Sequence, residues 1–251
     1  MYTKQDFLAQ LGKLGIDRQG TLLVHVSYKA IGAVDGRGDA VLDALIEFMR
    51  DGLLVLPAHT WANVKAGPAL NPVMDVLHTP TCVGVLTELF RQREGVYRSL
   101  HPTHSLAALG EGAKELLAGE EHIQTPCGHS GAYYRLWERN AQILLIGVNF
   151  MRNTFIHGIE EWDGALGSIS PDKTDLYTIN HAGQRLYTPQ FRHCSRLGSG
   201  TFGKLEPQAL AQNVMKLGRF GDATTRLMET VPLRVMTAKL LQEDPWYLSR
   251  H

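Results

Sequence analysis

The sequence predicts an α/β fold with a mostly parallel central sheet flanked by helices, and with a smaller C-terminal lobe that contains β-structure. Three short, continuous apolar runs, at 21–27, 52–58 and 142–147, are typical of strands covered on both faces. Segments of helical period lie between the runs, as in βαβ units. Toward the C-terminus the pattern changes to short alternating pieces. We therefore expect one domain, divided into an α/β core at 1–174 and a smaller lobe with closing helices at 175–251.

In the first half of the chain, the loop from His59 to about Pro80 is longer than most connections. Its length and its Pro, Asn and Gly content favour a functional flap. A strand pattern at 96–110 is interrupted by His101-Pro102. The elements expected here are helices at 1–15, 39–51, 83–93 and 111–119, strands at 21–27 and 52–58, and the broken strand at 96–110.

In the second half, a turn-rich stretch at 125–136 leads to the apolar strand at 142–147. The pieces at 175–179 and 185–191 flank the turn His181-Ala182-Gly183 and predict a β-hairpin. Helices are expected to close the chain, at 207–218, 222–231 and 232–242.

Composition excludes several classes of protein. Lys plus Arg and Asp plus Glu both number 25, so no basic excess indicates a nucleic-acid or membrane partner. The first helix contains charged residues and no later run could span a bilayer, so we expect a cytoplasmic protein. Cys82, Cys127 and Cys194 form no CxxC motif. They predict neither disulfides nor a metal site, and are expected to be small buried hydrophobes.

The transition at 142–157 is the strongest indication of chemistry. An apolar strand ends in a polar loop, and Asn153 or Thr154 can cap the helix that follows. His157 then lies in the first turns of that helix, where the positive end of the helix dipole disfavours the imidazolium form. This arrangement is typical of a general base.

Two acidic residues follow His157 on the same helix. Glu160 and Glu161 stand at i+3 and i+4, so either can reach the imidazole and hold one tautomer. The alternative is a capping or solvated arrangement without catalytic meaning.

Two further motifs indicate ligand contacts. The segment His25 to Gly32 follows the first strand, where backbone amides near Ser27 and Tyr28 and the charge of Lys29 could hold a phosphate group. The alternative is an ordinary turn between strand and loop. The stretch His101-Pro-Thr-His-Ser105 offers two imidazoles, but its proline prevents the helical spacing of a zinc peptidase. We therefore expect these side chains to form hydrogen bonds with a ligand rather than to bind a metal.

Two glycine-rich strings are weaker. Gly128-His-Ser130-Gly-Ala132 approaches the nucleophile elbow and permits a serine hydrolase that uses Ser130 with His129 or His157. Gly198-Ser-Gly-Thr-Phe-Gly203 matches a dinucleotide motif only as a string, because no βαβ unit surrounds it.

Six segments, in order and spacing, resemble the aminoglycoside 3-N-acetyltransferase family, which is distinct from the GNAT acetyltransferases. The most specific are HPTHS and NTxxH followed by an acidic residue. The six segments are LLVHVSYKAIGAVDG, GLLVLPAHTW, GVYRSLHPTHSLAALG, TPCGHSGAYYRLWE, ILLIGVNFMRNTFIHGIEEW and GRFGDATTRLME.

The resemblance implies direct transfer of an acetyl group from acetyl-CoA to an amine, by an enzyme that is a monomer or a homodimer. His157 would be the general base, and of the two acids that helix spacing places within its reach we take Glu160 as its catalytic partner. The segment from Ser27 to Gly32 would hold the pyrophosphate of coenzyme A, and the HPTHS stretch would line the pantetheine channel. The residues concerned are Ser27, Tyr28, Lys29, Ile31, Gly32, His104 and Ser105.

The acceptor is less defined than the reaction. Acidic residues that could bind a cationic amine are Glu161, Asp163 and Asp75. Where some relatives have acids just ahead of a position like His193, this chain has Gln190 and Arg192. Acetyl transfer is therefore a firmer expectation than an antibiotic acceptor, and a non-catalytic protein that binds coenzyme A or another small ligand is a third alternative.

Overall fold

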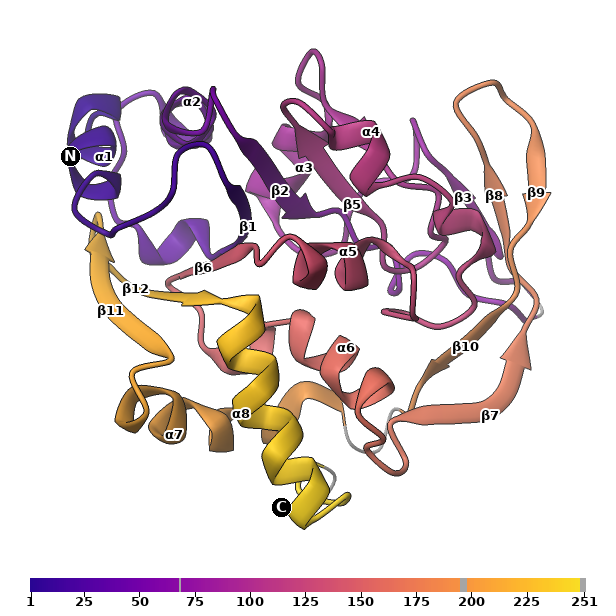
Figure 1. Ribbon diagram of the computed structural model, residues 1–251. Coiled ribbons are helices and arrows are strands. Elements are labelled where there is room, and N and C mark those ends of the chain that lie inside the picture. Colours follow the sequence, from indigo (N-terminus) through magenta and orange to yellow (C-terminus); the bar gives the residue numbers. More distant parts are fainter. Residues whose placement is uncertain (68, 195–197, 249–251) are drawn as a thin grey trace.

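The computed structural model describes residues 1–67, 69–194 and 198–248. Its centre is a seven-stranded sheet in the order β11-β12-β6-β1-β2-β5-β4 (Figure 1). The strands of this sheet are β1 (Thr21–Val26), β2 (Leu53–Pro57), β4 (Tyr97–Arg98), β5 (Leu106–Leu109), β6 (Gln142–Ile146), β11 (Met215–Phe220) and β12 (Ala223–Glu229).

The α/β class is confirmed, and the sheet is mixed. The three central strands β6, β1 and β2 pair in parallel, and β11 and β4 point the same way, whereas β12 and β5 run in the opposite direction. Five of seven strands thus share one direction, but only two of the six adjacent pairs are parallel. The expectation of a mostly parallel sheet therefore holds for the direction of the strands but not for their pairing. The pairs β4–β5 and β11–β12 are joined by short connections, which force antiparallel pairing.

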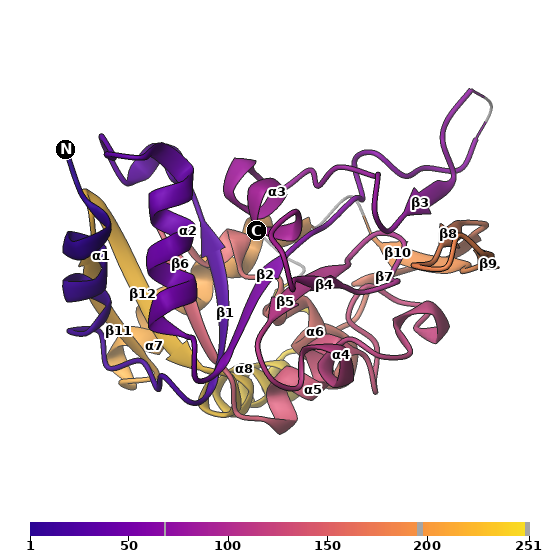
Figure 2. The ribbon, with the colours of Figure 1, turned by 90° about the horizontal axis from the view of Figure 1, so that it is seen from above.

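Helices cover both faces of the central sheet (Figure 2). One face packs on α1 (Lys4–Leu11), α2 (Arg37–Phe48) and α3 (Val85–Arg91). The other packs on α4 (Ala113–Leu116), α5 (Ala132–Glu138), α6 (Phe155–Trp162), α7 (Leu205–Ala211) and α8 (Thr230–Glu243). Short 3-10 helices are η1 (Tyr28–Ala30), η2 (Glu120–His122), η3 (Phe150–Arg152) and η4 (Gly198–Lys204). None of the helices in these ranges is long and apolar enough to cross a membrane.

Alternation along β1 assigns its side chains to the two faces. Leu22 and Val24 belong to the core beneath α1 and α2, whereas Leu23 belongs to the core beneath α5 and α6. His25 follows Leu23 by two residues, so it points to the same side as Leu23. This periodicity brings an imidazole to the end of a buried strand on the side of α6.

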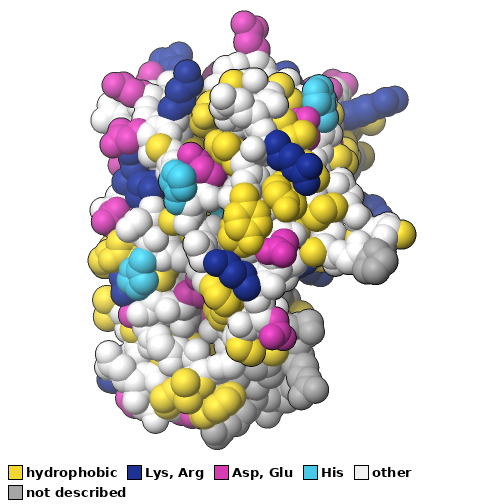
Figure 3. All heavy atoms as spheres, turned by 90° about the vertical axis from the view of Figure 1, so that its right-hand side faces the viewer, with side chains coloured by type: hydrophobic (Ala, Val, Ile, Leu, Met, Phe, Trp, Pro, Cys, Tyr) yellow, Lys and Arg dark blue, Asp and Glu magenta, His cyan; other side chains and the backbone are white. Residues whose placement is uncertain are grey.

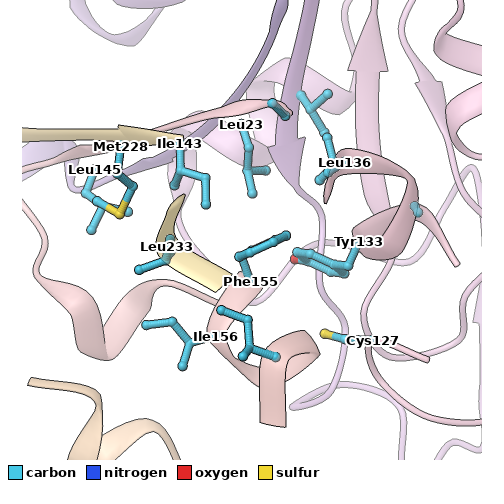
Figure 4. Close-up of a cluster of buried hydrophobic side chains, with 14 of the residues drawn as sticks. Leu23, Cys127, Tyr133, Leu136, Ile143, Leu145, Phe155, Ile156, Met228 and Leu233 are labelled. Carbon is cyan, nitrogen blue, oxygen red and sulfur yellow. The ribbon is translucent and has the colours of Figure 1, made fainter. Parts of the chain in front are cut away.

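The core fixes α6 firmly. Phe155 and Ile156 of α6 are fully buried. Figure 4 shows them pointing into a cluster that includes Leu23, Ile143 and Tyr133. Each buried large side chain stabilises the fold by about 1.5–3 kcal/mol. The helix that carries His157 has only eight residues, so it is held chiefly by this packing.

The smaller lobe, on the right of Figure 1, differs from the expected division at residue 174. Its three-stranded sheet has the order β3-β8-β9, and β3 (Val73–Asp75) comes from the 59–80 loop. The predicted hairpin is confirmed as β8 (Tyr177–Ile179) and β9 (Arg185–Tyr187). A second pair joins β7 (Ile169–Thr174) to β10 (Gln190–His193). The later strands β11 and β12 return to the central sheet. Neither part of the molecule is therefore a continuous segment of the chain.

The helix expected at 222–231 is wrong, and so is the end of the one expected at 207–218. The first range contains β12, and the second ends in β11 after α7. The strands β11 and β12 form an antiparallel hairpin, and β12 also pairs antiparallel with β6. The helix at 232–242 is confirmed within α8.

Candidate active site

A cavity of about 860 Å³ lies where β1, β2 and β6 end. Ser27, Pro57 and Val148, which end these strands or follow them within two residues, line the cavity. Arg192 and His193 of β10 close it on the side of the smaller lobe. Ligands of open α/β sheets bind at the carboxyl ends of strands, which makes this cavity the candidate site.

His157 lines this cavity and is paired with Glu160. Its Nδ1 lies 2.7 Å from Oε2 of Glu160, so the i+3 residue is the partner, and not the i+4 residue. Thr154 is the N-cap of α6, although its side chain makes no capping bond. Because the carboxylate holds Nδ1, the other ring nitrogen, Nε2, is the atom that can accept a proton from a ligand.

His193 forms a second imidazole–carboxylate pair beside the first. Its ring stacks on that of His157 with centroids 3.8 Å apart, and its Nε2 lies 3.1 Å from Oε1 of Glu161. Phe202 also packs on His157 in an edge-on arrangement, with centroids 4.6 Å apart. The His157 ring is thus in contact with two rings and one carboxylate, which fix its orientation.

The carboxylate of Glu161 is deeply buried. Its Oε1 accepts the backbone N–H of Cys127 and contacts His193, and desolvation raises its pKa to about 7. It does not line the large cavity, so it acts on His193 rather than directly on a ligand there.

Three further imidazoles line the cavity: His25, His59 and His104. The rings of His59 and His104 are 4.8 Å apart, and the ring of His104 is 5.3 Å from that of His193. Burial lowers the pKa of His25 to about 3 and holds those of His59 and His104 well below the usual value. These side chains therefore stay neutral near pH 7 and offer hydrogen bonds without charge.

Comparison with known proteins identifies the fold's relatives. The family model described as Aminoglycoside 3-N-acetyltransferase matches residues 23–242. The chain belongs to this family.

Among the relatives, the aminoglycoside N(3')-acetyltransferase-like protein YokD of Bacillus subtilis is 30% identical over 62% of this chain and 63% of YokD. The N(3)-acetyltransferase IV of Salmonella is 29% identical over 62% of this chain and 58% of that enzyme, so both alignments span less than two thirds of the relative. The N(3)-acetyltransferase VII of Streptomyces paromomycinus is 28% identical over 90% of this chain and 87% of that enzyme.

Solved structures of the family share the fold. The crystal structure of YokD superposes with a TM-score of 0.83 at 25% identity, over 97% of this chain and all of that one. AAC-IIIb, solved with CoASH, gives a TM-score of 0.83 at 21% identity, covering 96% of this chain and 97% of that one. AAC(3)-IVa, solved as a mutant in complex with a gentamicin, gives 0.82 at 23% identity, covering 98% of this chain and 91% of that one.

The residues that the family resemblance assigned to coenzyme A are divided by the structure. Ser27, Tyr28 and Lys29 line the cavity. Ile31 and Gly32 do not: Ile31 is fully buried in the core beneath α1 and α2, and Gly32 faces Asp222. The chain turns away from the cavity after η1, so only the first part of the segment can contact a ligand there.

The HPTHS stretch is divided in the same way. His104 lines the cavity, whereas Ser105 is fully buried and lies outside the lining. The Ser105 hydroxyl donates to the carbonyl of Ala58 at 2.6 Å and accepts Nε–H of Arg98 at 3.1 Å. In this structure the hydroxyl joins two strands and does not line the cavity, so its contact with pantetheine stays a prediction that the structure does not support.

The acids expected at the acceptor surface lie outside the large cavity. Asp163 forms a bidentate pair with Arg234 of α8, at 2.8 and 2.9 Å. Asp75 accepts the backbone N–H groups of Leu77 and His78 in the lobe. Neither lines the large cavity. On the face of the lobe shown in Figure 3, side chains of both charges are interspersed, without a single-sign patch.

Ser130 lies outside the large cavity, and its hydroxyl forms no hydrogen bond with a histidine in the described part of the chain. A nucleophilic serine needs a base within hydrogen-bond reach, so the hydrolase alternative has no support here. The cysteine expectation holds only for Cys127, because Cys82 and Cys194 line the cavity. Within 1–67, 69–194 and 198–248, no group of three His, Cys, Asp or Glu side chains could hold a metal ion.

Two residues of the site could not be found from local patterns. His193 and Trp61 both line the cavity, yet the residue pattern around each gave no reason to assign its own side chain to a ligand. His193 is 36 positions from His157, so only the pairing of β10 with β7 brings it to α6.

Proposed function

We propose that this protein is an acetyl-CoA-dependent N-acetyltransferase in which His157 is the general base and the acetyl group passes directly to the amine. The observation that carries the proposal is the His157–Glu160 pair, 2.7 Å apart, at the wall of a cavity that lies at the ends of β1, β2 and β6. Membership of the family supplies the reaction class.

The cavity suits coenzyme A at the end formed by β1 and β6. Lys29 follows β1 and Arg152 follows β6, and neither forms a salt bridge in the described residues. Two such cations, in the 3-10 helices η1 and η3 that follow neighbouring strands, can hold the phosphates of the cosubstrate. Nε2 of His25 is buried without a partner among the described residues, so it can bond to the polar groups of a pantetheine chain.

The chemistry uses few groups. The neutral amine attacks the thioester carbonyl carbon, a C–N bond forms, and the amine proton passes to Nε2 of His157. The tetrahedral intermediate then expels the sulfur, the C–S bond breaks, and the leaving thiolate recovers a proton as coenzyme A thiol. Glu160 stabilises the imidazolium that forms between these steps. No acyl-enzyme is formed.

The test combines binding with turnover. Calorimetric titration of the wild-type protein with acetyl-CoA should show binding, and thiol release should depend on an added amine. We expect His157→Ala to bind acetyl-CoA with unchanged affinity while kcat falls roughly 10²-fold or more, because a general base contributes about 10²- to 10⁴-fold.

The matched control is His122→Ala. The His122 side chain is 81% exposed and lies outside the cavity, so turnover should be unchanged. Unchanged turnover in His157→Ala would refute its role as base. Binding without thiol release across many amines would indicate the non-catalytic alternative, and absence of binding would refute the proposed function.

A further inference from the structure

We propose that the acceptor amine carries an anionic group, a carboxylate or a phosphoryl group, that binds Arg192. This inference rests on the proposed acetyl transfer and specifies its substrate class. Such an amine brings one negative charge to the acceptor end of the cavity, close to the histidine that takes the amine proton. Arg192 would neutralise that charge.

The position of Arg192 supports the proposal. Arg192 and His193 are consecutive residues of β10, and both line the cavity. In a regular strand, consecutive side chains point to opposite faces. The register of β10 against β7 shifts between Phe191 and His193, and such irregularities redirect side chains. The shift therefore brings a guanidinium and an active-site imidazole to the same cavity.

The guanidinium of Arg192 has N–H donors available for a ligand. Its Nη2 donates to the backbone carbonyl of Trp61 at 3.1 Å, and the described residues give it no carboxylate partner. Arginine has five N–H donors in a planar fork, which matches the two oxygens of a carboxylate or phosphoryl group. Burial lowers the pKa of Arg192 from its usual value, which agrees with an uncompensated charge.

The cavity offers no opposing charge. Its lining contains the cations Lys29, Arg152 and Arg192, and no Asp or Glu. The positions outside the described ranges contain no Asp or Glu side chain either. Glu160 and Glu161 are paired with His157 and His193, and they line a separate small cavity.

Two ends of the cavity can therefore serve two anions. Lys29 and Arg152, after β1 and β6, are the cations proposed for the phosphates of coenzyme A. Arg192 reaches the cavity from β10 and is tied to Trp61, beyond the end of β2, so it is available to the acceptor. A polycationic acceptor would instead meet a like charge and no carboxylate in the lining.

The experiment compares matched acceptors with the holoenzyme and acetyl-CoA. Amino acids and aminoalkylphosphonates of several chain lengths are each paired with their uncharged amide or diester, and aminoglycosides form a third set. We expect at least a 10-fold higher kcat/KM for the anionic member of the accepted pairs. Carboxylate and phosphonate series tell which anion fits.

Three variants locate the effect. Arg192→Gln should raise the acceptor KM at least 10-fold and leave the acetyl-CoA affinity unchanged by calorimetry, and Arg192→Glu should reverse the preference toward cationic amines. Arg185→Gln is the matched control, because Arg185 lies on exposed β9 outside the cavity, and it should change neither quantity.

Three results would overturn the inference while leaving acetyl transfer intact. They are equal kcat/KM within the pairs, turnover of aminoglycosides alone, and a weakened acetyl-CoA affinity in Arg192→Gln, which would assign Arg192 to the cosubstrate. Failure of the wild-type protein to bind acetyl-CoA would instead refute the proposed function itself.

Discussion

Replacing Arg98 by Met should strongly destabilise the fold. Arg98 lies in β4, is 3% exposed, and has no carboxylate partner in the described structure. Burial lowers its pKa to about 10, so it stays charged at neutral pH. Its guanidinium donates to the carbonyl of Thr79 at 2.6 Å, to that of Ala58 at 2.7 Å, to Ser105 Oγ at 3.1 Å, and weakly to that of Val76 at 3.4 Å.

These bonds join β4, the end of β2 and the 59–80 segment. Three of them are well formed, and a hydrogen bond to a charged group contributes about 1.5–3 kcal/mol. The opposing term is the desolvation of a buried cation, which amounts to several kcal/mol and is removed with the charge. The net loss in Arg98→Met should therefore be about 2–4 kcal/mol, since the Ala58 carbonyl keeps its bond from Ser105.

Urea unfolding of the wild-type protein and the variant measures this difference from the two midpoints at a common m-value. Arg185→Met is the control: Arg185 is an exposed arginine stacked on Tyr177, and its loss should cost less than about 1 kcal/mol. Loss of less than about 1 kcal/mol in Arg98→Met would refute the idea that these carbonyls depend on the guanidinium.

The other predictions concern pH, the serine of HPTHS and one glycine. Burial lowers the pKa of His101 to about 4, so the unfolded state binds the proton more readily and the stability of the fold should fall from pH 6.5 toward pH 4. In urea titrations, His101→Gln should lose less unfolding free energy than the wild-type protein between pH 7 and pH 5. An equal loss of unfolding free energy in the two proteins would contradict this. Ser105→Ala should lower the unfolding midpoint while leaving acetyl-CoA affinity unchanged; weaker affinity at unchanged stability would restore it to the channel. Gly147→Ala should destabilise the protein, because Gly147 has φ +64° and a Cβ would lie 2.3 Å from that of Ala30; an unchanged midpoint would show that η1 can move.

A strand could be predicted from the sequence where its own residues are apolar enough to indicate that it is buried. The strands β1 and β6 are nearly continuous apolar runs because both faces are covered, and the sequence predicts them almost to the residue. In β12 the buried position Thr225 is polar, and Arg226, Leu227 and Met228 are good helix formers, so the segment resembles a helix. Pairing with β6 overrides that local preference.

The candidate site follows the same rule. Glu160 and Glu161 are three and four positions from His157 on one helix, so the sequence predicts a local contact with one of them, and the structure assigns it to Glu160. The family resemblance assigns Ser105 and Ile31 to coenzyme A, and the charge of Asp163 suggests it for a cationic acceptor, but each of these side chains packs against or bonds to other residues of the protein. Which polar side chain faces a cavity and which faces a neighbour depends on packing that no local pattern records.

By itself, the sequence determined the α/β class, the strand ends that line the cavity, and His157 with an acidic residue one helical turn away, because period and spacing act over a few residues. The tertiary structure alone decided that His193 stacks on His157 and that Arg192 enters the same cavity. Both come from β10, whose register against β7 is irregular. Strand pairing joins residues that are distant in the chain, so the charge at the acceptor end is a property of the folded molecule.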